Sequence, residues 1–111
     1  RVDVPVVFFA TSVTGLFPRL SKLPVDAFGV DWRVSLTQAR ELLGRSTPLQ
    51  GNLDPQILTG PWEYARESAR AILDEARELP AHIFNLGHGI LPHTPVENVE
   101  RLVSFVGSYR A

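Results

Sequence analysis

The sequence predicts an α/β fold made of four consecutive βα units. Short apolar runs, typical of buried strands, alternate along the whole chain with longer amphipathic stretches, typical of helices. Capping residues and prolines stand where the longer stretches begin, as they do at helix starts. The 111 residues are enough for one compact domain with a modest core.

The predicted strands are the four apolar runs. They cover residues 6–10, 27–32, 47–53 and 81–86. The first run is continuously apolar after Pro5, which is typical of a strand buried on both faces of a parallel sheet. The composition of the third run gives the weakest strand prediction of the four.

The first two predicted helices differ in the strength of their signals. A helix interrupted by Gly15 and Pro18 is expected between residues 14 and 23. Ser35 followed by Gln38 forms a capping-box pattern, so a helix is expected to begin there. Gly44 is the expected stop of this helix, because glycine is common just beyond a helix end.

The last two helices are predicted to be the longest ones. Pro61 is expected to open the third helix, whose inner stripe would be Ala65, Ala69, Ile72, Leu73 and Ala76. Thr94 and Glu97 form a second capping-box pattern, with Pro95 at the first helical position. The expected apolar face of this helix is Val96, Val99, Leu102, Val103 and Val106.

The alternation implies parallel strands joined by right-handed crossovers. Two architectures fit this pattern, an open doubly wound sheet and half of an eight-stranded barrel, and periodicity does not choose between them. In both, ligands bind at the carboxyl ends of the strands. The residues that follow each apolar run are therefore the candidates for a site.

Composition excludes several classes of function. Lys plus Arg is 11 and Asp plus Glu is 12, so the net charge of -1 gives no electrostatic case for binding nucleic acid or an anionic membrane surface. The absence of cysteine excludes disulfides and thiolate metal sites. No apolar run could span a bilayer, and Asp3 and Pro5 argue against a signal peptide. Because the chain starts with Arg1 and contains no Met, we expect it to be a fragment or a processed piece.

The main site candidate is His88, which lies between Gly87 and Gly89 at the end of the fourth run. Glycines allow close backbone approach and positive φ, so the imidazole could project into a cleft and donate to a carboxylate. The alternative is a loop histidine that bonds backbone carbonyls. His82 is expected to be structural and His93 solvated, and the three histidines lack metal-ligand spacing, so no metal is expected.

Polar residues at the ends of the second and third runs are further candidates for lining a pocket. Gln50 and Asn52 share a strand face, where they line a polar pocket or satisfy buried backbone groups. Asp31 accepts from a ligand N–H or anchors the loop that follows it. Arg33 pairs with an anionic substrate or is a surface arginine, and Trp32 is expected to pack.

Three stretches, taken together, resemble the uroporphyrinogen decarboxylase family. They are GVDW at 29–32, LQGNLDP at 49–55, and HIFNLGHGILP at 82–92, which continues as TPVENV at 94–99. The resemblance runs from end to end of the chain, and the last stretch is the most specific. The fold of this family is a (β/α)8 barrel. The resemblance thus implies that residues 1–111 are the C-terminal part of a single barrel domain and supply its last four strands.

The resemblance also implies an activity. The family is a carboxy-lyase that removes CO₂ from the four acetate side chains of uroporphyrinogen III, giving coproporphyrinogen III in haem biosynthesis, without metal or organic cofactor. It implies a tetrapyrrole substrate, a missing N-terminal half of the barrel as partner, a homodimer, and a cytoplasmic or plastid location. The family's essential aspartate, arginines, tyrosine and serine lie in the first part of the barrel. No catalytic residue is therefore expected here, the fragment alone is expected to be inactive, and only His88 carries over, as a substrate-binding residue. The family usually has an acidic residue where His93 stands.

Two other classes of function remain as alternatives. Zinc-dependent cobalamin or coenzyme M methyltransferases of the same barrel superfamily resemble the chain at 52–55 and 94–95. Their motif has a zinc-binding cysteine where His88 stands, and this chain has no cysteine. The other alternative is a non-catalytic α/β binding module, which the length of the parent gene would distinguish.

Overall fold

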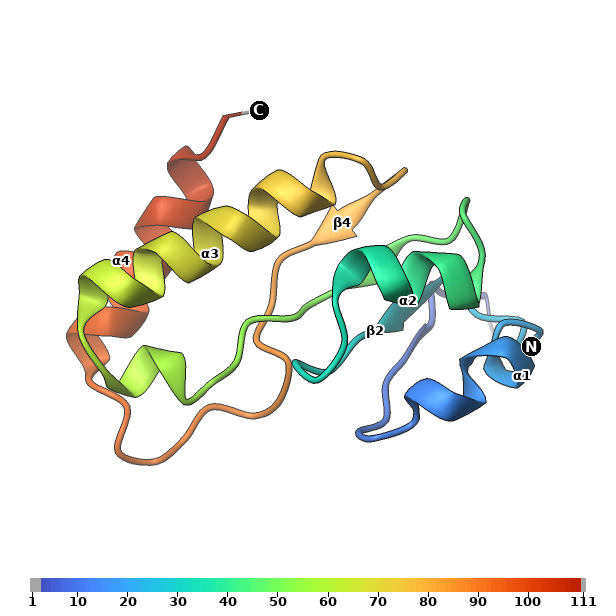
Figure 1. Cartoon of the computed structure of the whole chain (residues 1–111), viewed down its shortest axis with the longest axis horizontal. Helices are drawn as coiled ribbons and strands as arrows, with labels where there is room; N and C mark the ends of the chain where they lie inside the picture. Colours follow the sequence, from blue (N-terminus) through green and yellow to red (C-terminus); the bar gives the residue numbers. More distant parts are fainter. Residues whose placement is uncertain (1–2, 111) are drawn as a thin grey trace.

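A computed structural model describes residues 3–110, so Arg1, Val2 and Ala111, the ends of the expected domain, lie outside the described residues. Over this range the chain forms one parallel sheet in the order β1-β2-β3-β4, with helical segments after each strand (Figure 1). The strands are β1 (Val7–Phe8), β2 (Ala27–Gly29), β3 (Leu49–Gln50) and β4 (His82–Ile83). The helical segments are η1 (Thr14–Leu16), α1 (Phe17–Leu20), α2 (Leu36–Leu43), η2 (Ile57–Thr59), α3 (Trp62–Ala76) and α4 (Val96–Ser108). The predicted series of four βα units is confirmed.

The sheet has one face packed under helices and one open face. Phe28 pairs in register with Phe8 and Leu49, and all three side chains belong to the core that α1 and α2 cover. Gln50 pairs in register with Gly29 and Ile83. Because Gly29 and Gln50 directly follow Phe28 and Leu49 on their strands, this second row of residues lies on the other face of the sheet. Parallel strands of a complete barrel need both faces covered.

The first apolar run differs from its prediction. It was expected to be buried on both faces, but Val7 is 43% exposed and Phe9 is 45% exposed, while Phe8 between them packs against Phe28. On the fourth strand, Ile83 is 54% exposed on the same open face. Within residues 3–110 the chain supplies helices for one side of the sheet only, and this leaves the apolar side chains of the other side in contact with solvent.

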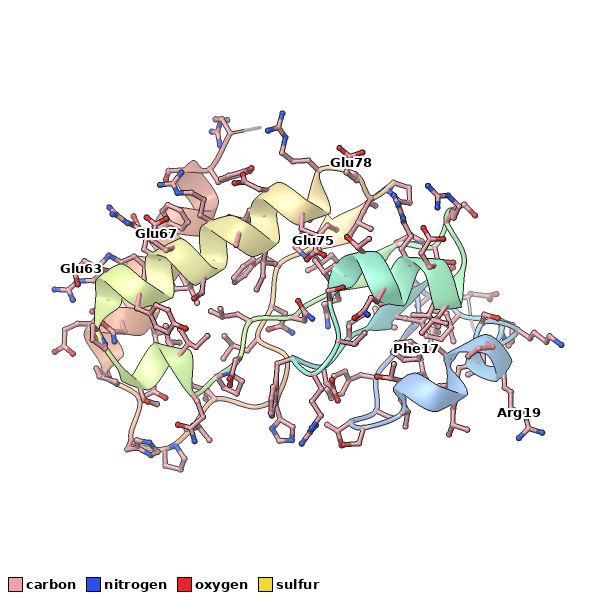
Figure 2. All side chains as sticks on the ribbon, viewed as in Figure 1. Phe17, Arg19, Glu63, Glu67, Glu75 and Glu78 are labelled. Atoms are coloured by element: carbon pink, nitrogen blue, oxygen red, sulfur yellow. The ribbon has the colours of Figure 1, made fainter. Side chains whose placement is uncertain are left out.

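The first two helical predictions are confirmed. The interrupted helix forms as η1 followed by α1, where Phe17 is buried and points toward α2 (Figure 2). At the start of α2, the Ser35 side chain accepts from the Gln38 N–H and the Gln38 side chain accepts from the Ser35 N–H, which completes the capping box. Gly44 ends α2 with a φ of 117°, a conformation that favours glycine.

Helix α3 packs through the small residues of its predicted stripe. Ala65 and Ala69 are completely buried, and they let the helix approach the core that contains Leu53 and Leu58. Helix α4 packs against α3, and the two lie side by side in Figure 1. Glu63 and Glu67 point outward from α3, as the amphipathic pattern predicts (Figure 2).

Helix α4 begins differently from its prediction. Pro95 is the N-cap rather than the first helical residue, and its side chain offers no cap hydrogen bond. The expected capping box at Thr94 is wrong: within the described residues, its buried hydroxyl has no hydrogen-bond partner. The packed face is also rotated, because Asn98 is buried while Val96 and Val103 are 69% and 68% exposed. Asn98 is held inside because its amide donates to the carbonyls of the η2 turn.

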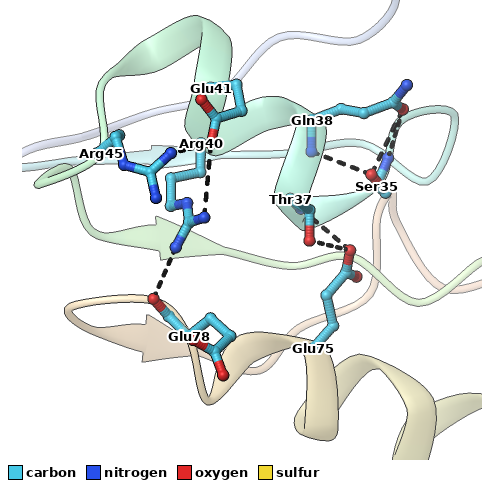
Figure 3. A network of polar contacts seen from close by, with 8 residues as sticks. All are labelled: Ser35, Thr37, Gln38, Arg40, Glu41, Arg45, Glu75 and Glu78. Carbon is cyan, nitrogen blue, oxygen red and sulfur yellow. Dashed lines mark hydrogen bonds and ion pairs between the residues drawn. The ribbon is translucent and has the colours of Figure 1, made fainter.

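Polar contacts tie α2 to the end of α3 (Figure 3). The Glu75 carboxylate accepts from the Thr37 N–H at 3.1 Å and from the Thr37 hydroxyl at 2.7 Å. The Arg40 guanidinium donates to the Glu78 carbonyl at 2.9 Å. Glu75 therefore caps the N-terminus of a helix 38 residues away, where a negative charge is favourable. In the part of the chain that the structure describes, no helix has the length and apolarity needed to cross a membrane.

Candidate functional site

A cavity of about 400 Å³ opens at the carboxyl ends of the strands. Its lining residues are Phe9, Gly29, Val30, Gln50, Asn85, Leu86, His88, Gly89 and Ile90. Each of the four strands contributes, either directly or through the residues that follow it. This is the place where open α/β sheets and barrels bind ligands.

The structure brings two of the predicted site residues together and leaves two apart. His88 and Gln50 both line the cavity, and the His88 side chain is exposed to it. Asp31 and Asn52 are buried and do not line it. The cavity is therefore bounded by the imidazole of His88 and the amides of Gln50 and Asn85, with apolar walls from Phe9 and Ile90.

The two glycines beside His88 differ in their surroundings. A Cβ on Gly87 would lie 2.5 Å from the Trp32 backbone nitrogen, so only glycine permits this approach. At Gly89, no described heavy atom outside its immediate neighbours lies within 4 Å of the Cβ position. The expected positive φ is found at neither glycine: among residues 3–110, the positive-φ glycines are Gly44 and Gly51. The position of His88 therefore depends on the close approach of Gly87 to Trp32 and not on a left-handed backbone conformation.

The Asp31 carboxylate anchors two loops of the site face. It accepts from the Ser12 N–H at 2.7 Å and from the Arg33 N–H at 2.9 Å. The Arg33 guanidinium also donates to it at 3.1 Å. Burial alone raises the pKa of Asp31, but these hydrogen bonds and the Arg33 charge outweigh burial and hold the pKa below its ordinary value. A charged Asp31 thus fixes the loops that follow β1 and β2.

The Arg33 side chain lies over the ring of Trp32, with 4.6 Å between the guanidinium carbon and the ring centroid. Trp32 is 40% exposed, so it packs less deeply than the sequence predicted. Its backbone, however, is in close contact with Gly87. The loop that follows β2 therefore supports the loop that carries His88.

Asn52 leaves the face that Gln50 occupies. Its amide donates to the Asp31 carbonyl at 3.0 Å and to the Val34 carbonyl at 2.5 Å. Gly51 has a φ of 135°, so the regular alternation of a strand ends between Gln50 and Asn52. Asn52 therefore satisfies buried backbone carbonyls, the second of the two roles that its position allows.

His82 lies at the start of β4, at the end of the strand away from the cavity. Its Nε2 makes a 2.6 Å hydrogen bond with the Gly51 carbonyl, which an Nε2–H tautomer donates. Burial lowers the pKa of His82, and the hydrogen bond to Gly51 opposes that effect only in part. Among residues 3–110, no three His, Cys, Asp or Glu side chains come together in a metal-binding group.

Among the cavity residues that the sequence did not predict are Phe9 and Asn85. Phe9 lies against Gly29, where an added Cβ would be 2.8 Å from the Phe9 Cδ1 atom. Asn85 lies two residues beyond Ile83 and so faces the same side of the sheet. The period-two alternation along β1 and β4 was the signal that could have found both. The composition of the first run predicts burial on both faces, and no site face is predicted on the fourth.

A cavity built by four parallel strand ends, with helices on one side of the sheet, defines a (β/α)-barrel type of protein. A methyltransferase from Methanosarcina mazei has this fold, with a TM-score of 0.80 over 99% of this chain and 33% of the methyltransferase, at 24% identity. At 24% sequence identity, this similarity supports a shared fold only. Residues 1–109 match the sequence family described as "Uroporphyrinogen decarboxylase (URO-D)". The chain belongs to the uroporphyrinogen decarboxylase family.

Curated relatives are similar over nearly the whole of this chain. The uroporphyrinogen decarboxylase of Koribacter versatilis (strain Ellin345) is 47% identical over 106 residues, which are 96% of this chain and 30% of the relative. That of Geobacillus sp. (strain WCH70) is 44% identical over 107 residues, 96% of this chain and 31% of the relative. The chain therefore spans less than a third of the length of these relatives.

Proposed function

We propose that this chain supplies one wall of the active site of a uroporphyrinogen decarboxylase. The proposal rests on family membership from end to end of the chain, together with a cavity at the strand ends that His88 lines. The reaction would convert uroporphyrinogen III to coproporphyrinogen III by loss of CO₂ from four acetate side chains, without metal or organic cofactor. It proceeds by protonation of a pyrrole carbon, loss of CO₂, protonation of the resulting methylene to a methyl group, and loss of the proton first added to the ring carbon, which restores the pyrrole. Such a route needs donors for several carboxylates as well as a group that stabilises positive charge.

We further propose that the chain is the C-terminal part of a single barrel domain. The exposed apolar residues Val7, Phe9 and Ile83 support this, because a second half-barrel would cover the face they share. A mainly apolar groove between β4 and α4, lined by Phe84, Val103 and other side chains, offers another surface for the rest of the domain. The isolated chain is expected to be inactive and to associate with itself. A monomeric isolated chain with cooperative unfolding would contradict this.

In this proposal His88 donates to the substrate from the rim of the cavity, while Gln50 presents a second polar group beside it. Phe9 and Ile90 form apolar walls against which a tetrapyrrole ring can pack. The groups that drive decarboxylation would come from the part of the domain outside this chain. Family membership supports a homodimer in the cytoplasm or a plastid, which gel filtration and cell fractionation of the full-length protein would test.

The test uses the full-length protein that contains this chain. Its product from uroporphyrinogen is measured by chromatography, and kinetics are compared for His88→Ala and for a control, His93→Ala, in an exposed loop outside the cavity. Loss of a ligand hydrogen bond predicts a fall in kcat/KM of about tenfold for H88A and little change for H93A. No turnover by the parent protein would refute the function. Parental kinetics in H88A would refute the role of His88.

A further inference from the structure

The orientation of the Asn85 side chain follows from its own backbone. Its Oδ1 accepts a hydrogen bond from the Leu86 N–H at 2.9 Å. A side-chain amide has one accepting oxygen and one donating NH₂, and a backbone N–H can only donate. The oxygen must therefore face Leu86, and the NH₂ group points away from it.

The NH₂ group of Asn85 is available to a ligand. The side chain is exposed, lies on the open face of the sheet above Ile83, and lines the cavity with His88 and Gln50. Asn85 also borders the groove between β4 and α4, but the other side chains that line that groove, among them Phe84, Val99 and Val103, are apolar. A polar partner for the amide therefore belongs in the cavity rather than in the groove.

We propose that the Asn85 NH₂ group donates a hydrogen bond to a carboxylate of the ligand bound in this cavity, which makes Asn85 a substrate-binding residue. The inference rests on the proposed function. A porphyrinogen offers two kinds of polar group, pyrrole N–H donors and carboxylate acceptors. Since the NH₂ group can only donate, its partner must be an acceptor, and a carboxylate gives the stronger, charge-assisted bond.

The replacement Asn85→Asp separates this role from a structural one. Aspartate has nearly the same shape and keeps an oxygen that accepts from the Leu86 N–H, so the local backbone contact is preserved. It replaces the NH₂ donor by a second oxygen with negative charge, which repels a carboxylate. Gln56→Glu is the matched control, because it adds the same charge at an exposed residue that does not line the cavity.

The variants are made in the full-length protein, and KM and kcat for uroporphyrinogen are measured with the midpoint of thermal unfolding. We expect N85D to raise KM by about tenfold or more with an unchanged unfolding midpoint, and Q56E to match the parent. Equal KM values for N85D and the parent would overturn the inference while leaving the proposed function in place. If N85D does not fold, Asn85→Ala takes its place: a KM raised about threefold or more supports the inference, and an unchanged KM overturns it.

Failure of the proposed function would be seen separately, as no turnover by the parent protein. In that case binding of uroporphyrin, a fluorescent porphyrin that carries eight carboxylates, is titrated against the parent and N85D. Weaker binding by N85D supports the carboxylate contact. Equal binding by the two proteins, or none by the parent, overturns it.

Discussion

Replacing Gly87 by alanine tests how the loop of His88 is positioned. The Gly87 N–H donates to the Leu53 carbonyl at 2.7 Å, so the backbone cannot move freely away from the segment that follows β3. An added Cβ would lie 2.5 Å from the Trp32 nitrogen and 2.9 Å from the Trp32 Cα. Ordinary contacts are about 3.5 Å or longer, so the two backbone segments would have to separate by roughly 1 Å.

The expected cost can be worked out from this contact. Overpacking costs about 1–3 kcal/mol, and the upper end applies because a backbone atom cannot rotate away as a side chain can. Alanine also restricts the unfolded chain, which stabilises by about 0.4–1 kcal/mol. We therefore expect Gly87→Ala to lower the free energy of unfolding by roughly 2 kcal/mol. Gly89→Ala is the matched control, since no described atom outside its immediate neighbours lies within 4 Å of its Cβ position and its φ is not positive.

Urea-induced unfolding of the full-length protein, followed by tryptophan fluorescence, measures both variants. Gly89→Ala should leave the free energy of unfolding unchanged or raise it by up to about 1 kcal/mol. Gly87→Ala should also lower kcat/KM, because moving this residue moves His88. Equal stabilities for the two variants would refute the argument that the contact between Gly87 and Trp32 requires glycine.

Three further predictions follow from contacts away from the cavity. Glu75→Ala should lower the free energy of unfolding by about 1 kcal/mol, because the contacts of Glu75 with Thr37 are lost. The control is Glu67→Ala, at an exposed residue whose ion pairs lie on its own helix, and it should change the free energy of unfolding by less than about 0.5 kcal/mol. Equal losses in the two variants would contradict this. Asn52→Ala should cost about 2–3 kcal/mol in urea unfolding, because two backbone carbonyls lose their buried donor, and a neutral result would count against it. Burial lowers the pKa of His82, so the unfolded state binds the proton more readily than the folded state does. The contribution of neutral His82 to the free energy of unfolding is therefore fully present above about pH 6.5, and it falls as the pH drops toward the lowered pKa. In a pH series of unfolding midpoints, His82→Asn should remove this slope, and the same slope in both proteins would rule out His82 as its source.

Elements whose signals are local were predictable from the sequence. The capping box of Ser35 and Gln38 needs only four consecutive residues, and Gly44 ends the same helix through its own backbone preference. The start of α4 was not predictable in the same way. Thr94 has the residue type of a cap, but the neighbouring chain leaves its hydroxyl without a described partner and holds Asn98 inside through the η2 turn, 38 to 40 residues earlier.

By itself the sequence determined the order of the βα units, the helix starts with local caps, and the place of His88 at the end of a strand. The tertiary structure decided which polar side chains reach the cavity. Asn52 has the right spacing from Gln50 but turns to buried carbonyls after Gly51, whereas Asn85 reaches the open face. Asp31 anchors a loop 19 residues earlier in the chain. Burial and hydrogen bonding between distant segments govern these choices, and neither quantity can be read from the spacing of residues along one strand.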